Sequence, residues 1–128
     1  MSSQAPSEAL VDELTSLRER VMGIAESLIS TADGLLVTGD TATVQPESVA
    51  ALSAAALALG RRTAAEVGFG GLRDVVSRCN RGYVVVLAIG DHALLVVLGD
   101  EGLDIAALHR ECPTTIDRLD KLLTANAA

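Results

Sequence analysis

The sequence is almost without aromatic residues: it has no tryptophan, one tyrosine and one phenylalanine among 128 residues. Its hydrophobic core must therefore be aliphatic, and the aromatic platforms on which proteins stack nucleic-acid bases are not available. The formal net charge of −7 further argues against nucleic acid or an anionic membrane surface as the main partner. We therefore expect no nucleic-acid partner and no direct membrane insertion.

Cysteines and long apolar runs are also scarce. The two cysteines, Cys79 and Cys112, do not form a CxxC motif, which favours free thiols in a reducing compartment. The longest apolar region is interrupted by Gly90-Asp91-His92 and is too short to span a bilayer. The N-terminal residues MSSQAPSEALVDE lack the basic flank and apolar centre of a signal peptide. These features predict a soluble, cytoplasmic protein.

Motifs for catalysis and for metal binding are missing as well. The histidines His92 and His109 have no further ligands at metal-binding spacing. The hydroxyl residues Ser27 and Ser30 lie outside any GxSxG motif, and the glycine-rich stretch 68–71 is not followed by Lys-Ser/Thr. No combination of acid, base and nucleophile is visible. We therefore expect a protein that is not an enzyme, with no cofactor and no metal.

The strongest positive signal is a pair of short apolar runs, Val84–Ile89 and Ala93–Leu98, on either side of Gly90-Asp91-His92. Both runs are rich in Val, Ile and Leu, which favours strands buried on both faces. A short glycine-containing connection between them predicts a β-hairpin. Because such a hairpin is apolar on both faces, we expect helices to cover each side.

Three further stretches have strand signals. Ile24–Ala32 and Leu35–Thr38 are joined by Asp33-Gly34, which predicts a hairpin with a type I′ turn. Leu72–Cys79 mixes β-branched residues with charges on both faces, which is typical of a strand at the edge of a sheet.

Helical spacing marks three other segments. The first begins after Ser7, a predicted N-cap, and ends near Gly23. The second begins at Pro46 and ends before Gly68, and the third follows Gly102. Pro113 lies inside the third segment and is expected to kink or split it.

The predicted order is helix, strand, strand, helix, strand, strand, strand, helix. It indicates an α+β fold with a five-stranded, mostly antiparallel sheet and helices on both faces. The chain length fits one domain over residues 7–125, between a flexible N-terminus (1–6) and a flexible C-terminus (126–128).

The second helical segment is unusually rich in alanine and is apolar nearly all round. One interpretation is that alanine serves only helix propensity. The other is that the helix covers the sheet on one side and contacts a second subunit on the other.

These features, in this order, resemble the Roadblock/LC7 family over residues 8–124. The matching parts are LVDELTSLRERVMGI, SLISTADGLLV, LSAAALALGRRTAAEVG and GGLRDVVSRCNRGYVVVLAIGDHALLVVLGDEGLD, followed by a C-terminal helix. The resemblance implies an adaptor without an active site, which forms homodimers or heterodimers. In such dimers the third strands pair edge to edge and the second helices lie side by side.

The resemblance thus implies a homodimer for this chain. The residues expected in its interface are Leu52, Ala55, Ala56, Leu59, Leu72, Asp74, Val75, Val76 and Ser77.

Bacterial members of the family often work with small Ras-like GTPases, so the resemblance also implies a GTPase-regulating adaptor in a bacterial signalling complex. The expected contact is the exposed side of the paired helices, near Arg61, Arg62 and Glu66. Two alternatives stay open: a dimeric scaffold that works without a GTPase, and a small-ligand sensor. A buried pocket with convergent polar groups would favour the sensor.

Overall fold

The computed structural model describes residues 6–125, so the predicted flexible segments 1–5 and 126–128 lie outside the described residues. Pro6 was predicted to be flexible and instead begins the first helix. The elements are α1 (Pro6–Arg20), β1 (Ile24–Thr31), β2 (Leu36–Asp40), α2 (Pro46–Val67), β3 (Asp74–Cys79), β4 (Gly82–Ile89), β5 (Ala93–Gly99) and α3 (Ile105–Ala125). The predicted order of helices and strands is confirmed.

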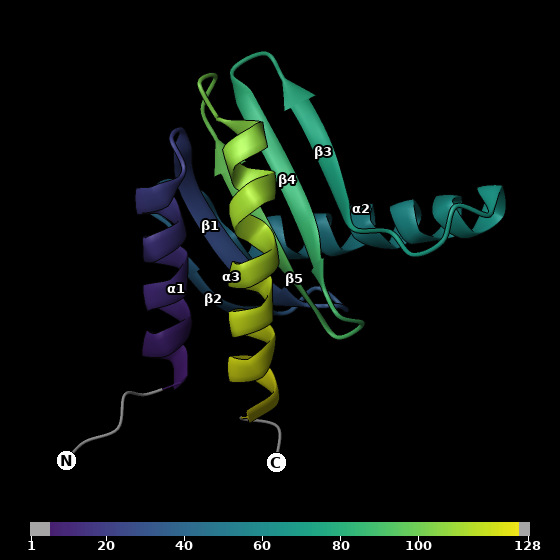
Figure 1. The fold of residues 1–128 in the computed structure, drawn as a ribbon, viewed down its shortest axis with the longest axis horizontal. Coiled ribbons are helices and arrows are strands. Elements are labelled where there is room, and N and C mark those ends of the chain that lie inside the picture. The colour runs from purple at the N-terminus through teal and green to yellow at the C-terminus, as the bar shows by residue number, and fades with distance from the viewer. Residues whose placement is uncertain (1–5, 126–128) are drawn as a thin grey trace.

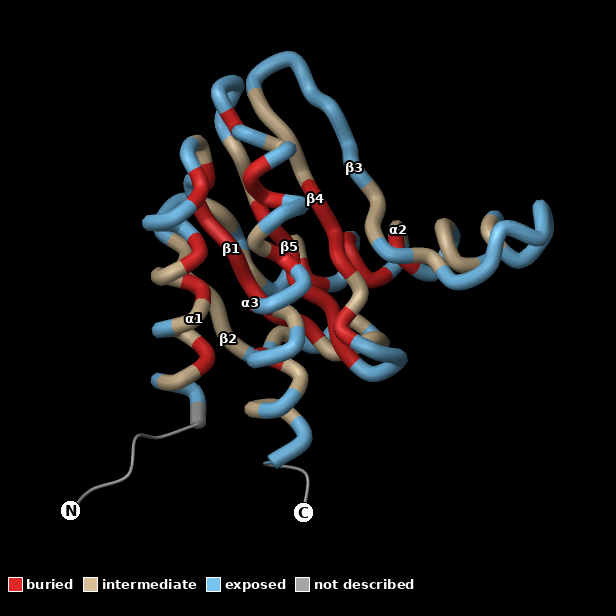
Figure 2. The backbone as a smooth tube through the Cα atoms, in the orientation of Figure 1, coloured by how far each residue is buried: buried red, intermediate tan, exposed pale blue. Residues whose placement is uncertain are grey.

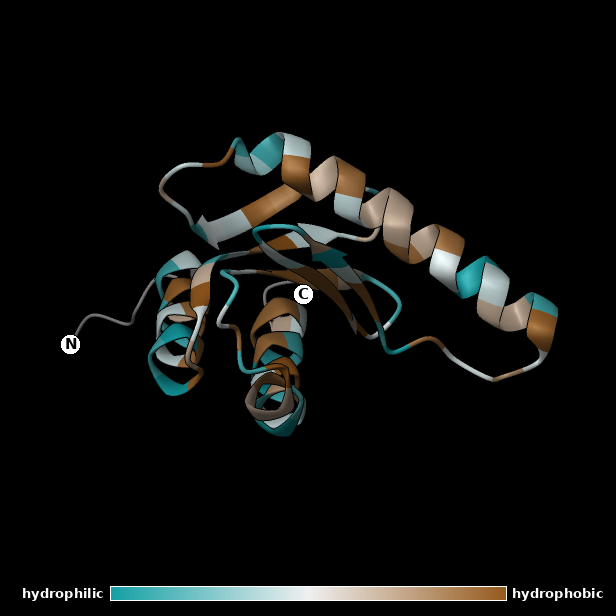
Figure 3. Cartoon of the chain, turned by 90° about the horizontal axis from the view of Figure 1, so that it is seen from above, coloured by the Kyte–Doolittle hydropathy of each residue, from teal (hydrophilic) through white to brown (hydrophobic). Residues whose placement is uncertain are grey.

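The strands form one antiparallel sheet in the order β2-β1-β5-β4-β3. The predicted central hairpin is present as β4 and β5, whose register begins at Ile89 opposite Ala93. β3 lies at the edge of the sheet, as its charged residues predicted. α1 and α3 cover one face of the sheet and α2 crosses the other (Figures 1 and 3).

The buried apolar residues fall into two clusters, one on each face of the sheet. Figure 2 shows that buried residues run along the central strands, whereas β3 is exposed over most of its length. The larger cluster lies between the sheet and the pair α1 and α3, and includes Leu14 and Leu108. The smaller cluster lies under α2 and includes Leu28 and Leu57. Helices therefore cover both faces of the central hairpin, as its sequence requires.

Pro113 was predicted to kink or split the third helix, and it does not split it, because α3 runs through Pro113 as one helix. A proline inside a helix removes a backbone hydrogen bond and costs about 3 kcal/mol. Here both halves of α3 place residues in the core, among them Leu108 and Leu119, and this burial offsets the cost. The helix start is also reinforced, since the Asp104 carboxylate accepts a hydrogen bond from the Ala107 N–H at 2.9 Å.

Two local predictions were wrong. Ser7 lies in the first turn of α1 and not at its N-cap, since the helix begins at Pro6. A type I′ turn requires a positive φ at both of its central residues. The β1–β2 connection is not such a turn, because among the described residues only glycines have a positive φ, so Asp33 does not. The Thr31 hydroxyl contacts Asp33 and accepts a hydrogen bond from the Leu35 N–H at 3.0 Å, so the loop is longer and β2 begins at Leu36.

The loop before α2 is held by a buried carboxylate on β1. Glu26 is only 8% exposed, and its Oε1 accepts hydrogen bonds from the backbone N–H groups of Ala42 (2.6 Å) and Thr43 (3.0 Å). Its Oε2 accepts a hydrogen bond from the Thr43 hydroxyl at 2.6 Å. These donors, the Ala42 N–H first, lower the pKa of Glu26 to about 2. The carboxylate therefore fixes the point from which α2 starts across the sheet.

This carboxylate predicts a defined loss of stability in acid. Because the pKa of Glu26 is lower in the folded state, its contribution is fully present above pH 4.5 and is lost as the pH falls toward 2. At about 1.4 kcal/mol per pKa unit, the free energy of unfolding should fall by up to about 3 kcal/mol from this group. Urea unfolding at several pH values should show this fall in the wild type and not in Glu26→Gln. Parallel pH curves for the two proteins would contradict the assignment.

Candidate functional site

The side of α2 that faces away from the sheet is apolar and uncovered. Leu52 and Leu59 are 72% and 64% exposed, and Phe69, just after the helix, is 86% exposed. Figure 3 shows that apolar residues continue along this helix on the side away from the strands. Because the apolar residues include large side chains as well as alanines, helix propensity alone does not explain them. This observation favours the interpretation in which α2 meets another surface.

α2 passes very close to β3 and then continues beyond it. A Cβ added at Gly60 would lie 2.6 Å from Leu72 Cδ2 and 3.0 Å from Val75 Cγ2, so a larger residue there would require the Leu72 side chain to shift. The C-terminal part of α2 extends past the edge of the sheet (Figure 1). A hollow of about 490 Å³ lies along the end of α2 and the loop after it, lined by Val67 and Phe69 among others.

The backbone of β3 is open on its outer side. In an antiparallel ladder the residues alternate between bonding the neighbouring strand and pointing away from it. Ala88 N–H donates to Arg73 O at 3.0 Å, and the register pairs Asp74 with Leu87. The alternation therefore turns the N–H and C=O groups of Asp74, Val76 and Arg78 outward. No other strand of the described chain lies beyond β3.

The side chains of β3 point alternately to the two faces of the sheet. Val75 packs against the cluster under α2. Asp74 points to the opposite face, where its Oδ2 lies 3.5 Å from Nε2 of His109 on α3. Val76 and Arg78 follow Asp74 at two-residue intervals and share its face.

The residues predicted for a dimer interface therefore lie along one side of the molecule. We call this side the edge surface, and it comprises the α2 residues Leu52, Ala55, Ala56, Leu59 and Val67, the loop 68–73 and β3. Five of the predicted residues are exposed in it and four are half-buried. The exposed residues are Leu52, Ala55, Leu59, Val76 and Ser77, and the half-buried ones are Ala56, Leu72, Asp74 and Val75.

The three residues predicted to contact a GTPase have different environments. Arg61 is half-buried, and its Nη2 donates a hydrogen bond to Gly90 O at 3.0 Å, which ties α2 to the β4–β5 turn. Arg62 and Glu66 are exposed and lie in the last part of α2, after Gly60. Of the three, Arg62 and Glu66 are the ones available to a partner.

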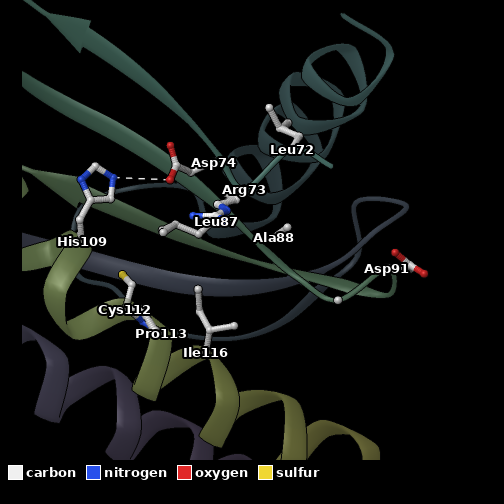
Figure 4. Close-up of a pocket in the computed structure, with 11 residues that line it drawn as sticks. Leu72, Arg73, Asp74, Leu87, Ala88, Asp91, His109, Cys112, Pro113 and Ile116 are labelled. Carbon is white, nitrogen blue, oxygen red and sulfur yellow. Dashed lines mark ion pairs between the residues drawn. The ribbon is translucent and has the colours of Figure 1, made fainter. Parts of the chain in front are cut away.

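A pocket of about 530 Å³ opens between the end of β4, the start of β3 and α3 (Figure 4). Leu87, Cys112 and Ile116 contribute apolar surface, and the Asp74–His109 pair lies at its edge (Figure 4). Burial, and secondly the nearby Asp74 carboxylate, raise the pKa of Cys112 to about 12, so its thiol is protonated. This pocket was not predicted, since its only signal in the sequence is the helical spacing of the α3 residues that line it.

The described residues contain no group of three or more His, Cys, Asp or Glu side chains able to hold a metal ion. None of the helices in the same part of the chain has the length and apolar content that crossing a membrane requires.

Comparison with known proteins gives one family and several similar structures. The family model for the Roadblock/LC7 domain matches residues 10–99. No curated protein sequence matches the chain. A Roadblock/LC7 domain from Streptomyces avermitilis has a TM-score of 0.81 and 24% identity, over 88% of this chain and 95% of that one.

Two further similar structures are named MglB. The gliding protein MglB from Thermus thermophilus has a TM-score of 0.81 and 20% identity, over 95% of this chain and 93% of its own. MglB from Myxococcus xanthus has a TM-score of 0.83 and 15% identity, over 98% of this chain and 95% of its own. At these identities the structures establish a shared fold.

Proposed function

Because this chain belongs to the Roadblock/LC7 family, we propose that it is a non-catalytic adaptor that forms a homodimer and regulates a small Ras-like GTPase. The proposal places it in a signalling complex in the bacterial cytoplasm. The observation that carries the proposal is the edge surface, where an open strand and an uncovered apolar helix face lie side by side.

A second copy of the chain suits this surface. Its β3 would supply hydrogen-bond partners to the outward backbone groups of β3, which are otherwise an open template for strand pairing. The exposed side chains of the two α2 helices, Leu52 and Leu59 among them, would cover each other on the same side of the extended sheet. A structure of MglB similar to this chain is described as a tetrameric arrangement, which supports self-association of this fold.

The GTPase is expected on the outer side of the paired helices. Arg62 and Glu66 are exposed there and offer charges of both signs to a partner. The proposed mechanism is indirect: the rigid dimer holds the switch loops of the GTPase in one arrangement and so changes its rate of hydrolysis.

The proposal predicts that the purified protein changes the rate of GTP hydrolysis by a small Ras-like GTPase from the same cell. Arg62→Ala should reduce this effect about tenfold, as expected when a charge-assisted contact of about 1.4 kcal/mol is lost. The matched control is Arg110→Ala, which removes an exposed arginine on a different helix, α3, and should behave as the wild type. Phosphate release with and without the protein measures both variants.

Unchanged hydrolysis and no binding across every small Ras-like GTPase of the cell would contradict the proposal. If the protein is still a dimer in that case, the GTPase-independent scaffold is favoured.

The pocket between β3, β4 and α3 supports the small-ligand sensor as a second candidate, since its volume and mixed lining fit a small molecule. Binding of a small molecule detected through the NMR signals of Cys112 and Ile116 would favour that function.

A further inference from the structure

We propose that β3 carries a self-complementary charge pattern that sets the register of the dimer and selects a second copy of this chain as its partner. In this arrangement Asp74 of each copy pairs with Arg78 of the other, and the two Val76 residues meet at the two-fold axis. The inference rests on the proposed homodimer and adds the residues that determine its specificity.

The backbone of β3 limits how two copies of the strand can pair. The outward N–H and C=O groups belong to Asp74, Val76 and Arg78, because Arg73 and the residues at even intervals from it bond to β4. Two β3 strands can form a regular ladder only if these residues of one copy face the same set in the other. If the pairing shifted by one residue, the outward N–H and C=O groups of one β3 would face residues whose N–H and C=O groups already bond to β4.

The two-fold symmetry of a homodimer limits the pairing further. For both α2 helices to cover the same face of a continuous sheet, the two-fold axis must be perpendicular to the sheet. Side chains of directly paired residues then point to the same face. The pairing can be centred on Val75, Val76 or Ser77 while keeping most of the strand Asp74–Cys79 paired.

The charges of β3 distinguish these three registers. A ladder centred on Val75 places Asp74 opposite Val76, and one centred on Ser77 places Val76 opposite Arg78. Only the ladder centred on Val76 places Asp74 opposite Arg78, and by symmetry it does so twice. Directly opposed residues of opposite charge stabilise an antiparallel pair.

Both charged side chains are available for this contact. Within residues 6–125, Arg78 is exposed and has no hydrogen-bond or ion-pair partner. Asp74 is half-buried, and His109 Nε2 lies 3.5 Å from its Oδ2, a long contact that leaves the carboxylate free to accept from a guanidinium. Both residues lie on the face opposite α2, beside the exposed Val76.

The pattern explains why the preferred partner would be an identical chain. Read along β3 it is negative, apolar, positive at residues 74, 76 and 78, and a second copy running in the opposite direction presents the complementary order. A strand with another arrangement of charges would place like charges or an apolar side chain opposite Asp74 or Arg78. The edge therefore favours self-pairing over pairing with related domains.

The test is a charge exchange between two variants, Asp74→Lys and Arg78→Glu. Each variant alone would form a dimer with two opposed like-charge pairs, and its self-association should weaken about ten- to a hundredfold. An equimolar mixture restores both attractive pairs, so a heterodimer should form with an affinity within about threefold of the wild type. Native mass spectrometry distinguishes the three dimers by mass, and sedimentation gives the affinities.

The controls are Asp91→Lys and Arg81→Glu, which make the same charge changes at exposed turn residues and should leave the dimer unchanged. If self-association of each charge variant is weakened but the mixture forms no tight heterodimer, the proposed register is wrong. If Asp74→Lys and Arg78→Glu each associate as tightly as the wild type, the proposed register is also wrong. If Leu59→Glu nevertheless dissociates the wild-type dimer, the proposed homodimer stands. A wild-type protein that is monomeric at high concentration would overturn both. Circular dichroism of each variant confirms that its monomer is folded.

Discussion

Replacing Leu59 with glutamate should convert the protein from a dimer to a monomer. Leu59 is 64% exposed in the single chain, and leucine and glutamate have similar helix propensities, so the fold itself should be unaffected. In the dimer, each copy would lose an apolar contact and bury a carboxylate without a partner. With about 2 kcal/mol or more lost in each copy, self-association should weaken at least about a thousandfold.

The matched control for this variant is the preceding residue. Ala58 is also exposed, and lies about 200° around α2 from Gly60, which faces β3. Ala58→Glu adds the same charge to the same helix and should remain a dimer. Light scattering and sedimentation over a range of concentrations measure both variants. If Leu59→Glu keeps the wild-type mass, or if both variants dissociate equally, the edge surface is not the interface as defined here.

Replacing Gly23 with alanine should destabilise the fold itself by about 3–5 kcal/mol, from backbone strain together with overpacking. Gly23 has a φ of 94°, and a Cβ there would lie 2.4 Å from Leu103 Cα. The neighbouring backbone cannot move away easily, because the Asp100 N–H donates to Gly23 O and the Asp104 N–H donates to Met22 O, both at 2.9 Å. This contact joins the start of β1 to the start of α3.

Gly70 provides the control because it has a similar φ of 89° but no atom within 4 Å of an added Cβ. Gly70→Ala therefore shows the conformational cost alone, which is about 1–2 kcal/mol. Urea unfolding of both variants gives the difference. Equal losses of stability would mean that the close approach of residues 23 and 103 does not constrain the fold.

Local sequence patterns were enough to predict the order of the elements and several of their boundaries. The extent of α2, from Pro46 to Val67, follows from a proline at its start and Gly68 after its end. The β4–β5 hairpin follows from two apolar runs around one turn, and the edge position of β3 follows from charge on both of its faces. These features depend on local backbone preferences and on how many sides of a segment must avoid water. Short stretches of sequence are enough to indicate both the backbone preferences and the number of buried sides.

Much of the candidate site could also be predicted in this way. The exposed leucines and alanines of α2 indicated an uncovered helix face, and the edge strand indicated an open backbone. The sequence did not show which backbone groups of β3 point outward, since that depends on its register with β4. It also did not separate Arg61, held by Gly90, from the exposed Arg62.

Other features depend on contacts between distant segments and became visible only in the folded chain. α3 continues through Pro113 because both of its halves are buried against the sheet and α1, and this packing outweighs the local loss of a hydrogen bond. The charge of Glu26 is buried because a loop sixteen residues away in the chain supplies its donors. The pocket beside His109 exists because α3 leaves part of β3 and β4 uncovered. In each case the deciding free energy comes from contacts between segments that are far apart in sequence, which no local pattern records.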